Sequence, residues 1–223
     1  MSKARVLLAV CALVLLVSAF ARADNIIYDN GGPNQQDGNE MTEWVQTEDF
    51  VLKSDQTLTD LHFWDIEASP GYFGSITWWV VGDDGNGNPN FNNILGTENT
   101  TNNMRVQLQC GIFGIYCEYS NWIDLTTPIA LKGGVTYHLA LHNGPVTNDA
   151  REEFYWETTN PNGTQTGLEC DLTTGACYSQ WFNNGNEHAF YLTGGQTNVP
   201  EPGTLALMGT GILGALAGLR RRF

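Results

Sequence analysis

Short runs of apolar and β-branched residues alternate with clusters of Asn, Gly, Asp and Pro through most of this 223-residue chain. The clearest run is MRVQLQC, in which Met104, Val106 and Leu108 alternate with Arg105 and two glutamines. This period of two is typical of a half-buried β-strand. Further strands are expected at residues 25–29, 43–52, 57–67, 74–83, 121–125, 129–143, 152–159 and 188–195. The pattern predicts an all-β, antiparallel β-sandwich of the jelly-roll type, with a barrel as the alternative.

Alternation along a strand also predicts which side chains share a face. Trp78 and Trp79 are adjacent, so one of them should be buried and the other could be exposed. His138 and His142 share a face of one strand but lie about 13 Å apart by strand rise. That separation is too long for the two histidines alone to hold one metal, and we expect both at the surface.

A basic head, an apolar run and a pair of small residues begin the chain. Lys3 and Arg5 precede an apolar run at residues 6–20, and Ala21 and Ala23 occupy the two positions that signal peptidase reads. This layout predicts a signal helix over residues 1–23, cut after Ala23. The alternative is an uncleaved anchor, although the run is shorter than the roughly 20 residues that a membrane span needs.

Negative charge dominates the middle of the chain, residues 24–197, which we expect to be one domain. It holds four basic residues against 23 acidic ones, a net charge of −19. Such a charge argues against binding to nucleic acid and against adsorption to anionic lipid. It suits a soluble exported domain, and it leaves open whether the acids also bind cations.

Four cysteines remain once the signal peptide is removed, in two pairs of equal spacing, CGIFGIYC and CDLTTGAC. Three connectivities are possible, and we favour the local one, Cys110 with Cys117 and Cys170 with Cys177. Each bond would staple a loop between neighbouring strands, for about 2–3 kcal/mol in the chain-entropy model. A four-cysteine zinc site is the weaker alternative, because its paired ligands usually stand closer in sequence.

Residues 198–223 form a separate tail. The segment from Thr204 to Leu219 is apolar or small throughout, which predicts a short transmembrane helix. Arg220, Arg221 and Arg222 follow it and should remain on the cytoplasmic side. The acidic domain would then face outward.

A short motif precedes this apolar run: VPEP, formed by Val199, Pro200, Glu201 and Pro202. VPEP, a glycine-containing apolar run and RRR together resemble the PEP-CTERM sorting domain. The resemblance implies a Gram-negative bacterium, an inner-membrane intermediate and processing by signal peptidase and then by an exosortase, a membrane cysteine protease-transpeptidase. It also implies delivery to the cell surface or to the extracellular polysaccharide matrix. The middle domain looks more loosely like the exported β-sandwiches that precede such tails, in YDNGGPN, EDFVL, LHFWD and VTYHLAL.

Known catalytic motifs are missing from the sequence, which has no nucleophile elbow, zinc-protease helix or phosphate-binding loop. We therefore expect a non-catalytic protein without a cofactor. One loop, DDGNGNPN, resembles the first half of a calcium-binding loop and supplies Asp83, Asp84, Asn86 and Asn88 as candidate ligands. The bidentate acid that should close such a loop is missing, since Leu95 stands in its place. An ordinary Asn/Gly turn is the alternative.

Tryptophans suggest a second kind of site. β-Sandwiches can bind sugars by stacking aromatic rings on them while amides reach the hydroxyls. The candidates are Trp181, Trp156 and Trp122, of which Trp181 lies in the most polar segment. The expected role is a structural or adhesive component of the envelope or matrix, and the alternative is a carbohydrate-binding module for the exopolysaccharide.

Overall fold

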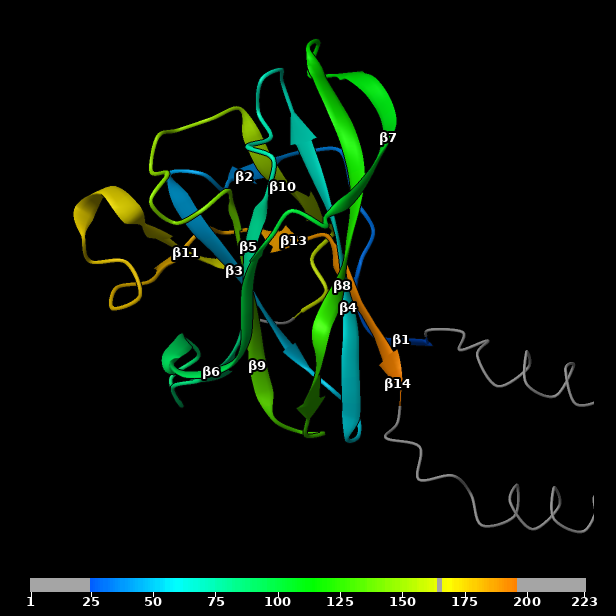
Figure 1. Ribbon diagram of the computed structural model, residues 1–223, viewed down its shortest axis with the longest axis vertical. Coiled ribbons are helices and arrows are strands. Elements are labelled where there is room, and N and C mark those ends of the chain that lie inside the picture. Colours follow the sequence, from blue (N-terminus) through cyan, green and yellow to red (C-terminus); the bar gives the residue numbers. More distant parts are fainter. Residues whose placement is uncertain (1–24, 164–165, 196–223) are drawn as a thin grey trace, which may run out of the picture.

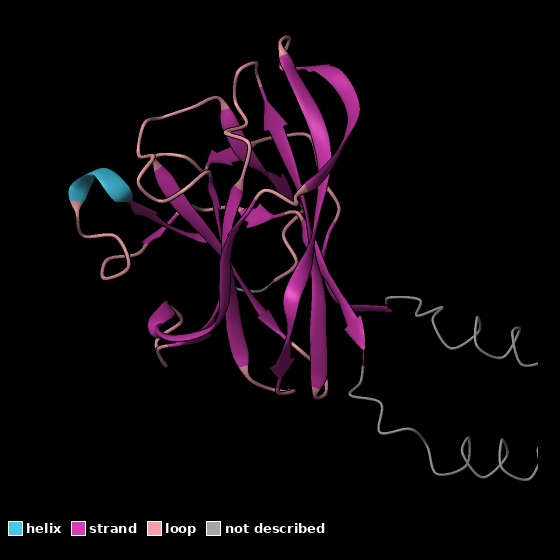
Figure 2. Ribbon diagram, in the orientation of Figure 1, coloured by secondary structure: helices cyan, strands magenta, loops and turns pink. Residues whose placement is uncertain are grey.

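The computed structural model describes residues 25–163 and 166–195, whose regular elements are almost all strands (Figures 1 and 2). One short 3-10 helix, η1 (Leu172–Thr174), is the exception in these ranges. The strands are β1 (Asn25–Gly31), β2 (Gly38–Glu40), β3 (Trp44–Val51), β4 (Gln56–Glu67), β5 (Ile76–Asp83), β6 (Pro89–Thr100), β7 (Met104–Ile112), β8 (Tyr116–Leu131), β9 (Thr136–Asn143), β10 (Phe154–Thr159), β11 (Leu168–Asp171), β12 (Phe182–Asn183), β13 (Glu187–His188) and β14 (Phe190–Gly195).

The first sheet is built around the long strand β4. On one side β4 pairs with β8, and β7 pairs in turn with β8. On its other side β4 pairs with β14 and, further along, with β10. Strand β1 pairs with β14, while β2 and β13 pair with β10. All of these pairings are antiparallel.

The second sheet has the order β12-β11-β3-β9-β5-β6 and is also antiparallel. Successive long strands pass between the two sheets: β3 lies in the second, β4 in the first, β5 and β6 in the second, and β7 and β8 in the first. The sheets face each other in Figure 1. The fold is therefore an all-β sandwich, as the alternating pattern predicted.

The main core lies between the sheets, and the period of two explains it. On β9, Tyr137, Leu139 and Leu141 point into this core. They meet side chains of the first sheet such as Phe63 and Trp156, both completely buried. Burial of this apolar surface is the main force that holds the two sheets together.

Two predictions about exposure were wrong. Trp78 and Trp79 are both buried, because the outer face of the second sheet is itself covered by side chains. His138 and His142 are buried on that same face. Their rings find polar partners there: His138 Nε2 lies 3.0 Å from Asp83 Oδ2, and His142 Nε2 lies 2.7 Å from the carbonyl oxygen of Thr42.

Five strands were not expected from the sequence, whereas both cysteine pairs were predicted correctly. Strands β2, β6, β11, β12 and β13 were not expected, because they are short or rich in Asn and Gly. Both local disulfides, Cys110–Cys117 and Cys170–Cys177, are present. Nowhere in the described ranges does the chain form an apolar helix of membrane-spanning length. The expected signal helix and tail helix lie outside those ranges.

Arg105 pairs with two acids of the first sheet. Its Nη2 donates to both carboxylate oxygens of Asp65 at 3.0 Å, and it lies 3.4 Å from Glu67 Oε1. Its guanidinium also sits over the rings of Tyr72 and Tyr119, at 4.1 and 4.3 Å from their centroids. Burial raises the pKa of Asp65 to about 7, and the charge of Arg105 opposes that rise.

We expect Arg105→Met to destabilise the protein at pH 9 by about 1–3 kcal/mol, since Asp65 must then either hold a buried charge without a partner or bind a proton that the unfolded chain does not bind. The loss should be smaller at pH 5, where the Asp65 carboxyl is protonated. Urea denaturation measures both values. Lys132→Met is the matched control, because it breaks the exposed Lys132–Asp55 pair and should cost far less stability at either pH. Equal losses in the two variants would contradict this account.

A second buried acid gives a pH dependence of defined sign. Burial raises the pKa of Glu157 to about 8, with a further contribution from Glu118. The unfolded chain releases this proton near pH 4.5 and the folded chain only near pH 8, so Glu157 costs stability progressively as the pH rises between those values. Glu157→Gln should therefore stabilise the protein at pH 8 relative to pH 5, on the order of 2–4 kcal/mol.

Glu153→Gln should change the pH dependence of stability in the opposite direction. Glu153 directly precedes β10, the strand that contains Glu157. Hydrogen bonds from Tyr116 and Tyr155 lower the pKa of Glu153, so its ionised form favours the folded state above pH 4.5. This variant should lose stability at pH 8 relative to pH 4. A Glu157→Gln profile parallel to that of the wild-type protein would show that Glu157 does not titrate as described.

Candidate functional site

The outer face of the second sheet carries its own apolar cluster, which we call the outer cluster. Its buried members come from four strands: Val45 of β3, Trp79 and Val81 of β5, Ala140 of β9 and Cys170 of β11. These side chains alternate with those that enter the main core, so the same period of two supplies both sets. The cluster needs a cover, which two irregular segments provide: the start of β6 and the chain after Cys170.

Aromatic rings form that cover. Phe91 of β6 lies over Trp79, with ring centroids 5.7 Å apart. The ring of Trp181 stacks on Phe91 at a centroid distance of 5.5 Å and an interplanar angle of 15°. Tyr178 packs against Phe91 at 4.6 Å and against Trp79 at 6.2 Å. Such pairs add to the area burial of the rings and hold their orientation.

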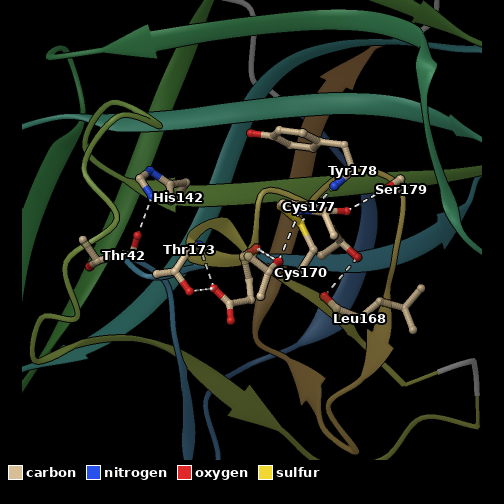
Figure 3. Close-up of a disulfide and its surroundings, with 12 residues drawn as sticks. Thr42, His142, Leu168, Cys170, Thr173, Cys177, Tyr178 and Ser179 are labelled. Atoms are coloured by element: carbon tan, nitrogen blue, oxygen red, sulfur yellow. Dashed lines mark hydrogen bonds between the residues drawn. A yellow bond between two sulfur atoms is a disulfide. The ribbon is translucent and has the colours of Figure 1, made fainter.

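The Cys170–Cys177 disulfide lies directly before Tyr178 (Figure 3) and closes the loop that leads to Trp181. Between the two cysteines the chain makes the single turn η1, where Asp171 accepts a hydrogen bond from the Thr173 amide at 2.7 Å. The turn ends at Gly175, in the left-handed region with φ of 66°. Tyr178 also has a positive φ, 71°, and its amide lies 3.4 Å from the sulfur of Cys170. The loop is thereby bent back over the outer cluster.

A pocket of about 570 Å³ opens between these two segments. That volume falls within the range usual for small-molecule sites. Its walls combine aromatic rings with side-chain amides and one carboxylate: Asp84, Asn88, Pro89, Asn90, Phe91, Asn92, Tyr178, Ser179, Gln180, Trp181 and Phe182. Phe182 is 52% exposed, and the indole N–H of Trp181 is buried with no hydrogen-bond partner in the described residues.

The predicted calcium loop forms one rim of this pocket. Asp84 accepts hydrogen bonds from the backbone amides of Asn86 and Asn88, at 2.7 and 3.1 Å, and from the Asn88 side-chain amide at 3.1 Å. These donors, with the Asn88 side chain first, lower the pKa of Asp84 to about 2. Asp83 accepts from the Gly85 amide and contacts His138. The Asn/Gly turn is therefore closed by its own hydrogen bonds.

Calcium would have to compete with these bonds for the Asp84 oxygens. In the described ranges, no three side chains of the types His, Cys, Asp and Glu gather as a metal-binding group. Two of the four candidate ligands, Asp84 and Asn88, line the pocket, whereas Asp83 and Asn86 do not. Calcium binding by this loop stays a prediction.

The three candidate tryptophans lie in different parts of the fold and differ in exposure. Trp181 lines the pocket beside Asp84 and Asn88, so the structure brings together residues that the sequence places about 100 positions apart. Trp156 is completely buried, and its indole donates to the carbonyl of Ala189, so the expected glycan contact at Trp156 is wrong. Trp122 is half-buried on β8 of the first sheet, away from the pocket.

Sequence reasoning missed most of the pocket wall. Phe91, Asn90 and Asn92 lie in the Asn-rich start of β6, which has no clear period of two. Tyr178 and Gln180 follow the second disulfide, and their position depends on how that loop bends. The clustering of Asn and Gln near aromatic residues was the one available signal.

The two disulfides close loops of equal length, which allows a matched test. Removing either pair by double serine substitution should cost about 2–3 kcal/mol in urea denaturation. Removing Cys170–Cys177 should in addition speed hydrogen exchange of the amides at residues 178–182, whereas removing Cys110–Cys117 should leave that exchange unchanged. Equal exchange in the two variants would show that the disulfide does not hold the pocket wall.

Comparison with known proteins informs the tail rather than the sandwich. A search of curated proteins with the whole chain finds no match. Residues 198–222 match the PEP-CTERM protein-sorting motif. The matched residues contain the VPEP motif, the apolar run and the three arginines, all of which lie outside the described ranges, as do Ala21 and Ala23 at the expected signal cleavage site. The chain thus ends in a PEP-CTERM sorting motif, which marks it as an exported protein that an exosortase sorts to the cell surface.

Proposed function

We propose that the sandwich is a non-catalytic carbohydrate-binding module, and that it gives the exported protein an adhesive role in the extracellular matrix. The pocket beside Trp181 is the observation that carries this proposal, because stacked aromatic rings and side-chain amides share its walls. Aromatic rings pack on the apolar faces of sugars, while amides exchange hydrogen bonds with hydroxyl groups.

Individual residues take distinct parts in this proposal. Trp181 and Phe182 offer aromatic surface to a sugar ring, and the stack on Phe91 holds Trp181 in place. Asn90, Asn92 and Gln180 supply donors and acceptors. A ligand hydroxyl that reaches the unpartnered indole N–H of Trp181 would satisfy a donor that is otherwise costly to bury.

Charge narrows the class of glycan. The domain at residues 24–197 has a net charge of −19, and Asp84 stays ionised at the pocket rim. Anionic polymers would be repelled, so neutral polysaccharides or glycans with amino groups are the favoured ligands. Calcium bound at the Asp84 loop would offset this negative charge and so allow anionic glycans to bind. We propose calcium binding at that loop alone.

The acids of the domain support a non-catalytic role. Glycoside hydrolysis needs two carboxyl groups on either side of the bond. Asp84 is the one carboxylate in the described lining of the pocket. Glu118 and Glu157 come closer to such a pair, but both are buried and held by Gln35, whose side chain donates to Glu118 and whose backbone amide donates to Glu157.

The cellular setting completes the proposal. We assign the protein to a Gram-negative bacterium, with signal peptidase and exosortase acting in turn on the two ends of the chain. An inner-membrane intermediate held by the tail would precede release to the surface or matrix. We also assign the passage of strands between the two sheets to the jelly-roll type.

Isothermal titration of the full chain, kept in a nonionic detergent, against neutral, amino and anionic matrix polysaccharides tests the proposal, with and without calcium. Heat of binding should appear with a neutral or amino glycan. Trp181→Ala should weaken the affinity by about tenfold, since it removes from the site both the ring that packs on the sugar and its apolar surface.

Trp122→Ala is the matched control, because Trp122 is a half-buried tryptophan on the other sheet. Its affinity should equal that of the wild-type protein. Absence of heat with every glycan, in a protein with an intact near-UV circular dichroism spectrum, would reject the binding role and leave a purely structural one. Equal losses in both variants would move the site away from the pocket.

A further inference from the structure

Strand β7 lies at one border of the first sheet, on the opposite side of the sandwich from the loop between β11 and β12 that lines the pocket (Figure 1). Among the described residues it pairs with β8 and with no other strand. The backbone N–H and C=O groups on its other edge are therefore free to pair with another chain. An edge of this kind either carries a protective device or serves as a contact.

Apolar side chains are exposed along this strand and at the hairpin tip that follows it. Met104, Val106 and Leu108 are 41, 47 and 51% exposed, and Phe113 and Ile115 are 57 and 71% exposed. Alternation places the first two on the outer face of the sheet, in register with Trp122 and Ser120 of β8. Several exposed large apolar side chains on one strand and its hairpin tip are typical of an interaction site.

Three other sheet borders carry protection that the first half of β7 lacks. Strand β12 has only two residues, β6 carries Glu98 and β1 carries Asp29. The single charge of β7 is Arg105, and its side chain is turned inward to Asp65. Bulges interrupt the second half of β7, but Met104 to Gln107 pair regularly with β8.

Charge decides which partner suits this edge. Residues 99–117 contain no Asp or Glu, within a domain whose net charge is −19. Two copies of this domain repel each other wherever their acidic surfaces meet. They can approach along β7, which carries no acid of its own and exposes apolar side chains. The acids beside it are engaged, since Glu118 is buried and accepts from Gln109, and Glu153 accepts from Tyr116.

We propose that β7 and the tip of its hairpin form the contact through which two copies of this chain associate. Antiparallel pairing of β7 with β7 of the second copy is self-complementary about a twofold axis, as isologous interfaces require. The exposed apolar side chains of both copies would then cover each other. This inference does not rest on the proposed glycan pocket, which lies on the other sheet.

Hydrogen exchange of the full-length protein in nonionic detergent tests the contact at β7 directly. The amides of residues 104–112 should become more protected as the protein concentration rises, and more so at high ionic strength, because salt screens the repulsion between two acidic copies. A cationic partner protein would give the opposite salt dependence. Val106→Lys should remove the concentration-dependent protection and weaken association by about tenfold or more, since it places like charges in the contact.

Ile94→Lys is the matched control, because Ile94 is 46% exposed on β6, the border of the other sheet. This variant should show the same concentration-dependent protection of the β7 amides and the same strength of association as the wild-type protein. The proposal is wrong if the β7 amides of the wild-type protein exchange at the same rate at every concentration, a result that needs no variant to fold. It is also wrong if Ile94→Lys weakens association as much as Val106→Lys does.

Discussion

The outer face of the second sheet has to be covered, and the rest of the structure follows from that constraint. A strand period of two sends Trp79, Val81 and Ala140 away from the main core, into what would otherwise be water. The start of β6 and the loop closed by the Cys170–Cys177 disulfide cover these side chains. Because both covers are irregular segments rich in Asn, Gln and aromatic residues, they leave a lined pocket between them.

The many acidic residues are the second constraint, and buried and exposed acids are accommodated differently. Buried acids are paired with the few available cations or donors: Arg105 holds Asp65, and His188 Nδ1 lies 3.0 Å from Glu48 Oε2. Burial lowers the pKa of His188 to about 4, so this pair is held by a hydrogen bond of the neutral ring. The remaining acids stay at the surface, where they limit contacts to partners that are neutral or cationic, or to acid-free surfaces.

The strongly alternating strands, the sandwich and the local disulfides could be predicted from the sequence, because each depends on short-range pattern. The sorting tail could be predicted because its residues are contiguous. The burial of Trp79, His138 and His142 could not be, since it depends on loops that return to cover the second sheet. Part of the pocket could be predicted, since Trp181 and the Asp84 turn were candidates. Nothing in the sequence indicated that Phe91 would stack on Trp181.

The central claim is that a sugar binds beside Trp181 while the other tryptophans serve the fold. Nuclear magnetic resonance of the full chain with ¹⁵N-labelled tryptophan, titrated with oligosaccharides of the matrix polymer, tests it most directly. The account predicts that the indole signal of Trp181, identified by its loss in Trp181→Phe, shifts with ligand while those of the buried Trp78 and Trp156 stay in place. A shift confined to Trp122, or no shift in any indole signal at saturating ligand, would contradict it.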